Sequence, residues 1–206
     1  MDDIKINITS SRSLDPTILK TSFDEWYEEL EPSDQHLIRF NVQIYSVDEY
    51  GEKTDDVGHM QGDFFDLEYG MSEEAYYFFM LCDSVSQDLS NMASSIINKD
   101  GCIQEYICGP DEKLLYLDKL YIEPKYRNMG IGSYVINEIK ELLEYCCQIS
   151  PDVAVLLPSP QEKINGKIVT IKDNKEYDDK KNQLIQLYKS CGFQKIANED
   201  FMFKKL

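Results

Sequence analysis

The segment from Leu114 to Lys140 constrains the fold more than any other part of the chain. It reads LLYLDKLYIEPKYRNMGIGSYVINEIK, and its first nine residues are mostly apolar or aromatic. This run predicts a strand that ends before Pro124, and a short basic loop with glycines at Gly130 and Gly132 follows. Apolar residues then recur at helical spacing, at Ile131, Val135, Ile139, Leu142 and Cys146. A strand that passes through a glycine loop into a helix predicts a mixed α/β fold.

The rest of the sequence predicts strands and helices in mixed order. Further strands are expected at residues 4–8, 37–47, 57–68, 102–108 and 153–157, with two short ones in 193–206. Helices are expected after Asp15-Pro16 (with Leu19, Phe23, Trp26 and Leu30 on one side), at 72–98 with a break near Asp83-Ser84, at 131–147 and at 180–190. Residues 158–179 read as a long polar loop, either a binding loop or a surface insertion. This order predicts an α/β sandwich around one sheet.

Length and composition favour one globular domain over residues 1–206. No apolar run reaches the length of a membrane helix, and the acidic start of the chain lacks the apolar core of a secretory signal. Six cysteines form no C-x-x-C pair, and two histidines have no ligand-spaced partner, so we expect no metal site. These features predict a cytoplasmic protein with reduced thiols.

The net charge of −17 excludes general affinity for nucleic acid, whose phosphates would be repelled. We also expect no membrane association. An acidic chain suits a cationic substrate that is drawn to an acidic cleft. The simpler explanation of the same charge is a solvated acidic surface that keeps the protein soluble.

The glycine loop has the chemistry of an anion site. The first amide groups of a helix lack intrahelical partners, and the helix dipole favours negative charge there. Gly130 and Gly132 let a phosphate approach the backbone, and Arg127 adds a cation. The loop is neither a dinucleotide fingerprint nor a P-loop. A tight turn that needs glycine only for packing is the other interpretation.

Two motifs together resemble the GNAT N-acetyltransferase superfamily. The stretch from strand to helix matches its motif [RQ]-x-x-G-x-[GA] at Arg127, Gly130 and Gly132. Downstream, LYKSCGF (187–193) is similar to its second signature, a helical tyrosine followed by Gly-Phe. The resemblance covers about residues 114–206 and implies a mostly antiparallel central sheet flanked by helices. It also divides the chain into an acceptor-side half, 1–100, and an acetyl-CoA-binding half, 101–206.

The resemblance implies how acetyl-CoA, the co-substrate, is bound. The pyrophosphate would contact Arg127 and the amides of the loop residues Asn128, Met129, Gly130, Ile131, Gly132 and Ser133. The pantetheine arm would contact the backbone of Leu120, Tyr121 and Ile122. Many relatives carry an asparagine seven residues before the tyrosine; that position is Lys181 here, and Asn182 is the neighbouring candidate.

Transfer to an amine needs a proton for the departing thiolate and a group that binds or deprotonates the amine. The resemblance assigns the acid to Tyr188. Asp118 is the candidate base, and strand alternation would place it on one face with Leu120 and Ile122. The other interpretations are a packed tyrosine and a strand carboxylate paired with a nearby lysine. Glu105, on the expected neighbouring strand, is a weaker candidate.

These residues predict an N-acetyltransferase that moves acetyl from acetyl-CoA to a primary amine by direct attack in a ternary complex. The acceptor is a small-molecule or protein amine, and oligomerisation stays open. One alternative is a GNAT-fold module that binds acetyl-CoA without turnover, as a sensor or interaction domain. Another is transfer of a longer acyl group. The aromatic residues 76–79 either line the acceptor site or pack in the core.

Overall fold

A seven-stranded sheet forms the centre of the computed structural model, which describes residues 3–11, 37–66, 75–109, 112–171 and 175–206. In spatial order the strands are β1 (Asp3–Ser11), β2 (Leu37–Val47), β3 (Lys53–Phe65), β4 (Leu114–Ile122), β5 (Val153–Leu156), β9 (Met202–Lys205) and β8 (Gln194–Lys195). Every neighbouring pair is antiparallel except β4 and β5, which run parallel. The expected mixed, mostly antiparallel sheet is confirmed.

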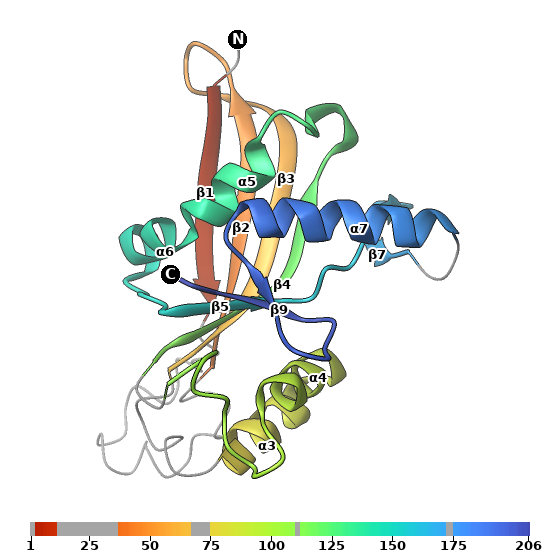
Figure 1. Ribbon diagram of the computed structural model, residues 1–206. Helices are drawn as coiled ribbons and strands as arrows, with labels where there is room; N and C mark the ends of the chain where they lie inside the picture. The colour runs from red at the N-terminus through yellow and green to blue at the C-terminus, as the bar shows by residue number, and fades with distance from the viewer. Residues whose placement is uncertain (1–2, 12–36, 67–74, 110–111, 172–174) are drawn as a thin grey trace, which may run out of the picture.

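Helices cover both faces of this sheet (Figure 1). The helices α5 (Ile131–Asn137), α6 (Ile139–Cys147) and α7 (Lys175–Ser190) lie over one face. The helices α3 (Ala75–Val85) and α4 (Gln87–Ile96) lie against the other. Each pair of layers encloses its own apolar core, and each buried Leu, Ile or Phe contributes about 1.5–3 kcal/mol. We call these faces the α5–α7 face and the α3–α4 face.

The apolar pattern of the strands explains which face they bury. In β2 the side chains of Phe40, Val42 and Ile44 alternate into the core of the α5–α7 face, as a half-buried strand requires. The expected hairpin of β2 with β3 is confirmed by their antiparallel register. The predicted bounds of β2 and β4 agree with the structure, and the expected strand 4–8 lies within β1.

Two predicted helices are interrupted. The break expected near Asp83-Ser84 lies at Ser86, whose hydroxyl accepts a hydrogen bond from the Leu89 amide at 3.3 Å and caps α4. The predicted helix at 131–147 divides into α5 and α6 at Glu138. The helix expected after Asp15-Pro16 lies outside the described residues.

The strand expected at 102–108 is wrong. Only an isolated bridge joins Ile97 to Ile103 there. The Asn98 side chain accepts hydrogen bonds from the amides of Asp100 and Cys102, and Gly101 has a φ of +77°. Because this turn satisfies the local backbone groups, no strand forms.

The long loop expected at 158–179 is also wrong. It contains a β-hairpin of β6 (Gln161–Ile164) and β7 (Lys167–Thr170), and α7 already begins at Lys175. The turn residues Asn165 and Gly166 have φ values of 51° and 79°, as a two-residue hairpin turn with two left-handed positions requires.

Candidate active site

The parallel strands β4 and β5 separate part-way along the sheet. They pair only from Leu114 to Leu117, whereas β4 continues to Ile122. Where they separate there is a pocket of about 420 Å³. Its lining comes from β4, the loop before α5, the segment after β5, and α7: Leu117, Asp118, Leu120, Tyr121, Ile122, Tyr126, Arg127, Asn128, Gly130, Ile131, Gly132, Ser133, Ile136, Leu156, Leu157, Ser159, Pro160, Gln161, Lys180, Gln183, Leu184, Leu187 and Tyr188. Most of the sequence-predicted groups therefore meet at one pocket, and the exceptions are given below.

The loop between β4 and α5 is tied to the sheet beneath it. It includes a short 3-10 helix, η2 (Pro124–Tyr126), in which Lys125 and Tyr126 both bind the carboxylate of Asp55 on β3. Arg127 donates from Nε to the Ile122 carbonyl oxygen at 2.8 Å. Its guanidinium carbon lies 5.4 Å from the centre of the Tyr121 ring. These contacts fix the loop at the end of β4.

Gly130 allows the loop to turn directly into α5. Its φ of +80° is left-handed, and the first helical hydrogen bond runs from the Tyr134 amide to the Gly130 carbonyl oxygen at 2.9 Å. The amides of Ile131 to Ser133 therefore precede the helical ladder and remain for a ligand. With Arg127 beside them they can bind an anion. Met129, also expected here, is exposed and does not line the pocket.

Tyr188 lies in the pocket wall and in the apolar core at the same time. Only 8% of its surface is exposed, and its ring centre lies 5.9 Å from that of Phe193. The turn after α7 closes on it, because the Phe193 amide donates to the Tyr188 carbonyl oxygen at 3.0 Å. Burial raises the pKa of the Tyr188 phenol to about 12, and the Cys191 thiol adds to the rise. The hydroxyl therefore stays protonated at neutral pH and can act as a proton donor.

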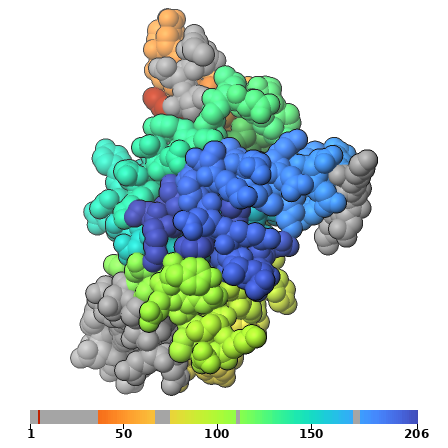
Figure 2. Space-filling view, in the orientation of Figure 1, coloured from red at the N-terminus to blue at the C-terminus, as the bar shows by residue number. Residues whose placement is uncertain are grey.

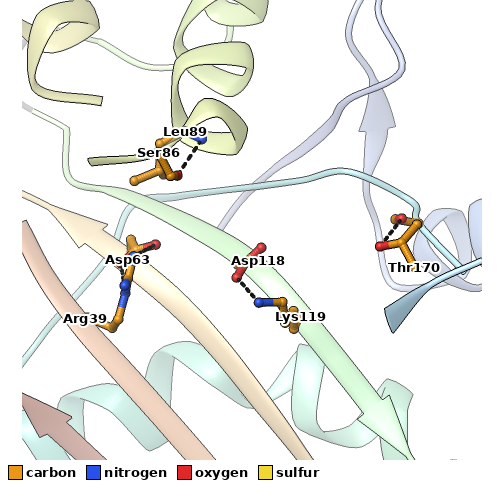
Figure 3. A network of polar contacts seen from close by, with 8 residues as sticks. Arg39, Asp63, Ser86, Leu89, Asp118, Lys119 and Thr170 are labelled. Carbon is orange, nitrogen blue, oxygen red and sulfur yellow. Dashed lines mark hydrogen bonds and ion pairs between the residues drawn. The ribbon is translucent and has the colours of Figure 1, made fainter. Parts of the chain in front are cut away.

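A β-bulge on β4 changes where Asp118 points. Leu117 pairs with Gly62 and Lys119 pairs with Gln61 on β3, so Asp118 is the extra residue. Leu120 and Ile122 pack against the core of the α5–α7 face, but Asp118 points to the α3–α4 face, the side on which Asp63 also lies (Figure 3). The expected common face for Asp118, Leu120 and Ile122 is therefore wrong, because the bulge breaks the alternation.

Two ion pairs lie close together on this face (Figure 3). Arg39 donates from Nε and Nη2 to the buried carboxylate of Asp63, at 2.8 and 3.3 Å. Burial raises the pKa of Asp63, and Arg39 opposes that rise. Lys119 Nζ lies 3.2 Å from Asp118 Oδ2. The carboxylate of Asp118 is thus paired with a lysine. This pairing is the interpretation that the sequence offered as the alternative to a catalytic base.

The β6–β7 hairpin lies between the end of β4 and the start of α7. Lys163 of β6 pairs with Glu123 at 2.5 Å, and Glu162 pairs with Lys180 of α7 at 2.6 Å. The space-filling view shows the segment after β4 and helix α7 in contact on this side of the molecule (Figure 2). Sequence reasoning missed this hairpin, although Asn165-Gly166 is a strong hairpin signal.

Some candidate residues lie away from the pocket. Asn182 is exposed and outside the lining, and its neighbour Lys181 pairs with Asp200 at 3.0 Å. Glu105 is exposed and lies in a turn instead of a strand. Tyr76 and Tyr77 are exposed, whereas Phe78 is buried in the core of the α3–α4 face.

The described residues contain neither a metal-binding cluster nor a membrane-spanning helix. No group of three His, Cys, Asp or Glu side chains in the described part of the chain is arranged to hold a metal ion. No described helix is both long and apolar enough to cross a membrane.

Comparison with known proteins gives one family. The family described as acetyltransferase (GNAT) domain matches residues 89–195, just over half of the chain. This range contains β4, the glycine loop, the separation of β4 from β5, and Tyr188. No curated protein matches the chain.

Several solved structures are similar over most of the chain. One is a bacterial toxin that is 12% identical. The match covers 100% of this chain and 92% of the toxin chain, with a TM-score of 0.43. Arylalkylamine N-acetyltransferase 2 from Aedes aegypti is 9% identical. That match covers 79% of this chain and 72% of the Aedes chain, with a TM-score of 0.40. AtaTR bound with AcCoA is 11% identical. That match covers 98% of this chain and 93% of the AtaTR chain, with a TM-score of 0.41. At such low identities and TM-scores, the family match is the stronger finding.

Proposed function

Since the chain belongs to the GNAT acetyltransferase family, we propose that it transfers an acetyl group from acetyl-CoA to a primary amine by direct attack in a ternary complex. One observation carries this proposal. The pocket between β4 and β5 is lined both by the loop from Arg127 to Ser133 and by Asp118, which points to the opposite face of the sheet. Acetyl-CoA and the acceptor amine can therefore enter this pocket from opposite faces of the sheet and meet in it.

The loop and β4 would hold acetyl-CoA. The amides of Ile131, Gly132 and Ser133 and the guanidinium of Arg127 suit the pyrophosphate, because helix N-termini and cations attract phosphate oxygens. Beyond Leu117, no strand among the described residues pairs with β4 on its β5 side. The pantetheine arm would lie along this edge and form backbone hydrogen bonds there, as an added strand does.

The chemistry uses groups that already line the pocket. The neutral amine nitrogen attacks the thioester carbon, and a backbone amide among Leu120, Tyr121 and Ile122 stabilises the oxyanion. The carbon–sulfur bond then breaks, and the Tyr188 hydroxyl protonates the CoA thiolate. The proton that the attacking nitrogen loses to become an amide restores the Tyr188 hydroxyl. Asp118 would bind the incoming ammonium and accept a proton from it.

We extend the proposal to the location of the protein and to the roles of its two halves. We place the protein in the cytoplasm, and we assign the acceptor side to residues 1–100 and the acetyl-CoA side to 101–206. The position of Tyr188 in the pocket wall favours an enzyme over a module that binds acetyl-CoA without turnover. Net charge favours a cationic acceptor.

The test measures CoA release from acetyl-CoA with pools of polyamines, amino acids, arylalkylamines and lysine peptides. Tyr188→Phe removes the proton donor, and we expect about a 10²–10⁴-fold loss of kcat. Tyr145→Phe is the matched control, because Tyr145 is 90% exposed on α6. Calorimetric binding of acetyl-CoA is measured for all three proteins. Binding without turnover in any pool would favour the non-catalytic module, and no binding would refute the assignment of the loop.

A further inference from the structure

The bulge on β4 brings two consecutive side chains together. Neighbouring residues of a regular strand point to opposite faces, so they cannot form an ion pair across the sheet. At Asp118 the extra residue interrupts this alternation. As a result, Lys119 Nζ lies 3.2 Å from Asp118 Oδ2, as Figure 3 shows.

The two partners differ in exposure. The Asp118 side chain is 17% exposed and lines the pocket, whereas the Lys119 side chain is 40% exposed and does not line it. The carboxylate therefore belongs to the pocket, and the ammonium reaches it from the solvent side. An ammonium this exposed can return to water at small cost.

The other ion pair on this face is complete in itself. Asp63 is held by both Nε and Nη2 of Arg39. Within the described residues, Lys119 is the cation that pairs with Asp118. Replacing the Lys119 ammonium by another ammonium would leave the local charge unchanged, so such an exchange carries little electrostatic cost.

We propose that Lys119 is an internal counter-ion of Asp118, which the ammonium group of the acceptor displaces when it binds. Lys119 thereby indicates the substrate class: a primary ammonium on a flexible alkyl chain. This inference rests on the proposed function. It adds a specificity-determining residue, because a neutral amine gains nothing by displacing Lys119.

The experiment compares two probes, n-butylamine, which is cationic near neutral pH, and aniline, which is neutral there. Lys119→Met removes the ammonium but keeps most of the side chain, and Lys119→Arg keeps the charge. Lys53→Met is the matched control, because Lys53 forms a 2.5 Å ion pair with Asp56 at the exposed tip of β2 and β3 and its loss changes net charge equally. Circular dichroism checks that each variant is folded.

For Lys119→Met we expect KM for butylamine to fall by about two- to fivefold, the effect of losing a partly exposed ion pair. The change lies in KM because Lys119 competes with substrate binding and takes no part in the chemical step. We expect KM for butylamine to stay near the wild-type value in Lys119→Arg and Lys53→Met. We expect KM for aniline to stay near its own wild-type value in all three variants.

Three results would overturn this inference alone: an unchanged KM for butylamine in Lys119→Met, an equal fall in Lys53→Met, or an equal fall for aniline. Acetyl-CoA binding without turnover of butylamine in either the wild type or Lys119→Met would also overturn it. Calorimetry separates these results from failure of the proposed function. A wild-type protein that does not bind acetyl-CoA would refute both.

Discussion

Replacing Arg39 by Met tests whether the buried carboxylate of Asp63 needs its cation. Asp63 has 2% of its side chain exposed, and Arg39 holds both of its oxygens. Breaking a buried ion pair costs about 3–5 kcal/mol, because the remaining charge is buried without a partner. Since the Arg39 side chain is 43% exposed, water would screen part of this loss. We therefore expect a loss of about 2–3 kcal/mol of unfolding free energy near neutral pH.

The loss should depend on pH with a defined sign. Burial raises the pKa of Asp63 above its ordinary value of 3.8. A carboxyl group whose pKa is raised by folding binds its proton more tightly in the folded state. Its contribution to stability is therefore complete below pH 3.8 and is lost as the pH rises through the folded pKa. Removal of Arg39 raises that pKa further, so Arg39→Met should be destabilised more at pH 7 than at pH 4.5 (about 1 kcal/mol or more apart).

Urea unfolding followed by circular dichroism at both pH values measures this difference. The double variant Arg39→Met/Asp63→Asn carries no buried charge, so we expect it to regain more than half of the lost stability at neutral pH. Equal destabilisation of Arg39→Met at both pH values would refute the reasoning. So would a double variant that is no more stable than Arg39→Met.

Three further predictions concern glycine positions. Gly130→Ala should weaken acetyl-CoA binding and cost about 1–2 kcal/mol of stability, because Gly130 has a left-handed φ. Calorimetry measures the binding and urea unfolding measures the stability. Gly130→Asn should have a smaller effect on both. Gly62→Ala should lower Tm, since its new Cβ would lie 2.4 Å from the Tyr116 carbonyl oxygen, and such overpacking costs about 1–3 kcal/mol; an unchanged Tm would contradict the packing. Gly166→Val should speed amide hydrogen exchange in β6 and β7 only, and slower or unchanged exchange there would contradict the turn assignment.

Sequence reasoning located the elements whose apolar pattern is strong. The bounds of β2 were predictable because it buries alternate side chains, and those of β4 because it begins with a continuous buried run. The strands β6 and β7 have four residues each and are partly or fully exposed, so burial gave no pattern to detect. Only the turn dipeptide Asn165-Gly166 marked them.

The site was predictable where it depends on local backbone chemistry. Arg127, Gly130 and Tyr188 meet at the pocket, since a glycine loop and a helix end specify their own geometry. The direction of Asp118 was not predictable, because a bulge depends on the register with β3 and leaves no sequence pattern. Asn182 was assigned by its position near an expected asparagine, and the rotation of α7 places it in solvent instead.

The separation of β4 from β5 also bears on the energetics of the whole molecule. Their pairing ends at Leu117, so the two halves of the sheet are joined through only four residue pairs. A linear ligand that lies along the rest of β4 would bridge the two halves and bind the folded chain alone. By mass action, ligand at 100 times its Kd adds about 2.7 kcal/mol to the unfolding free energy. The melting temperature of such a protein would report the concentration of its co-substrate.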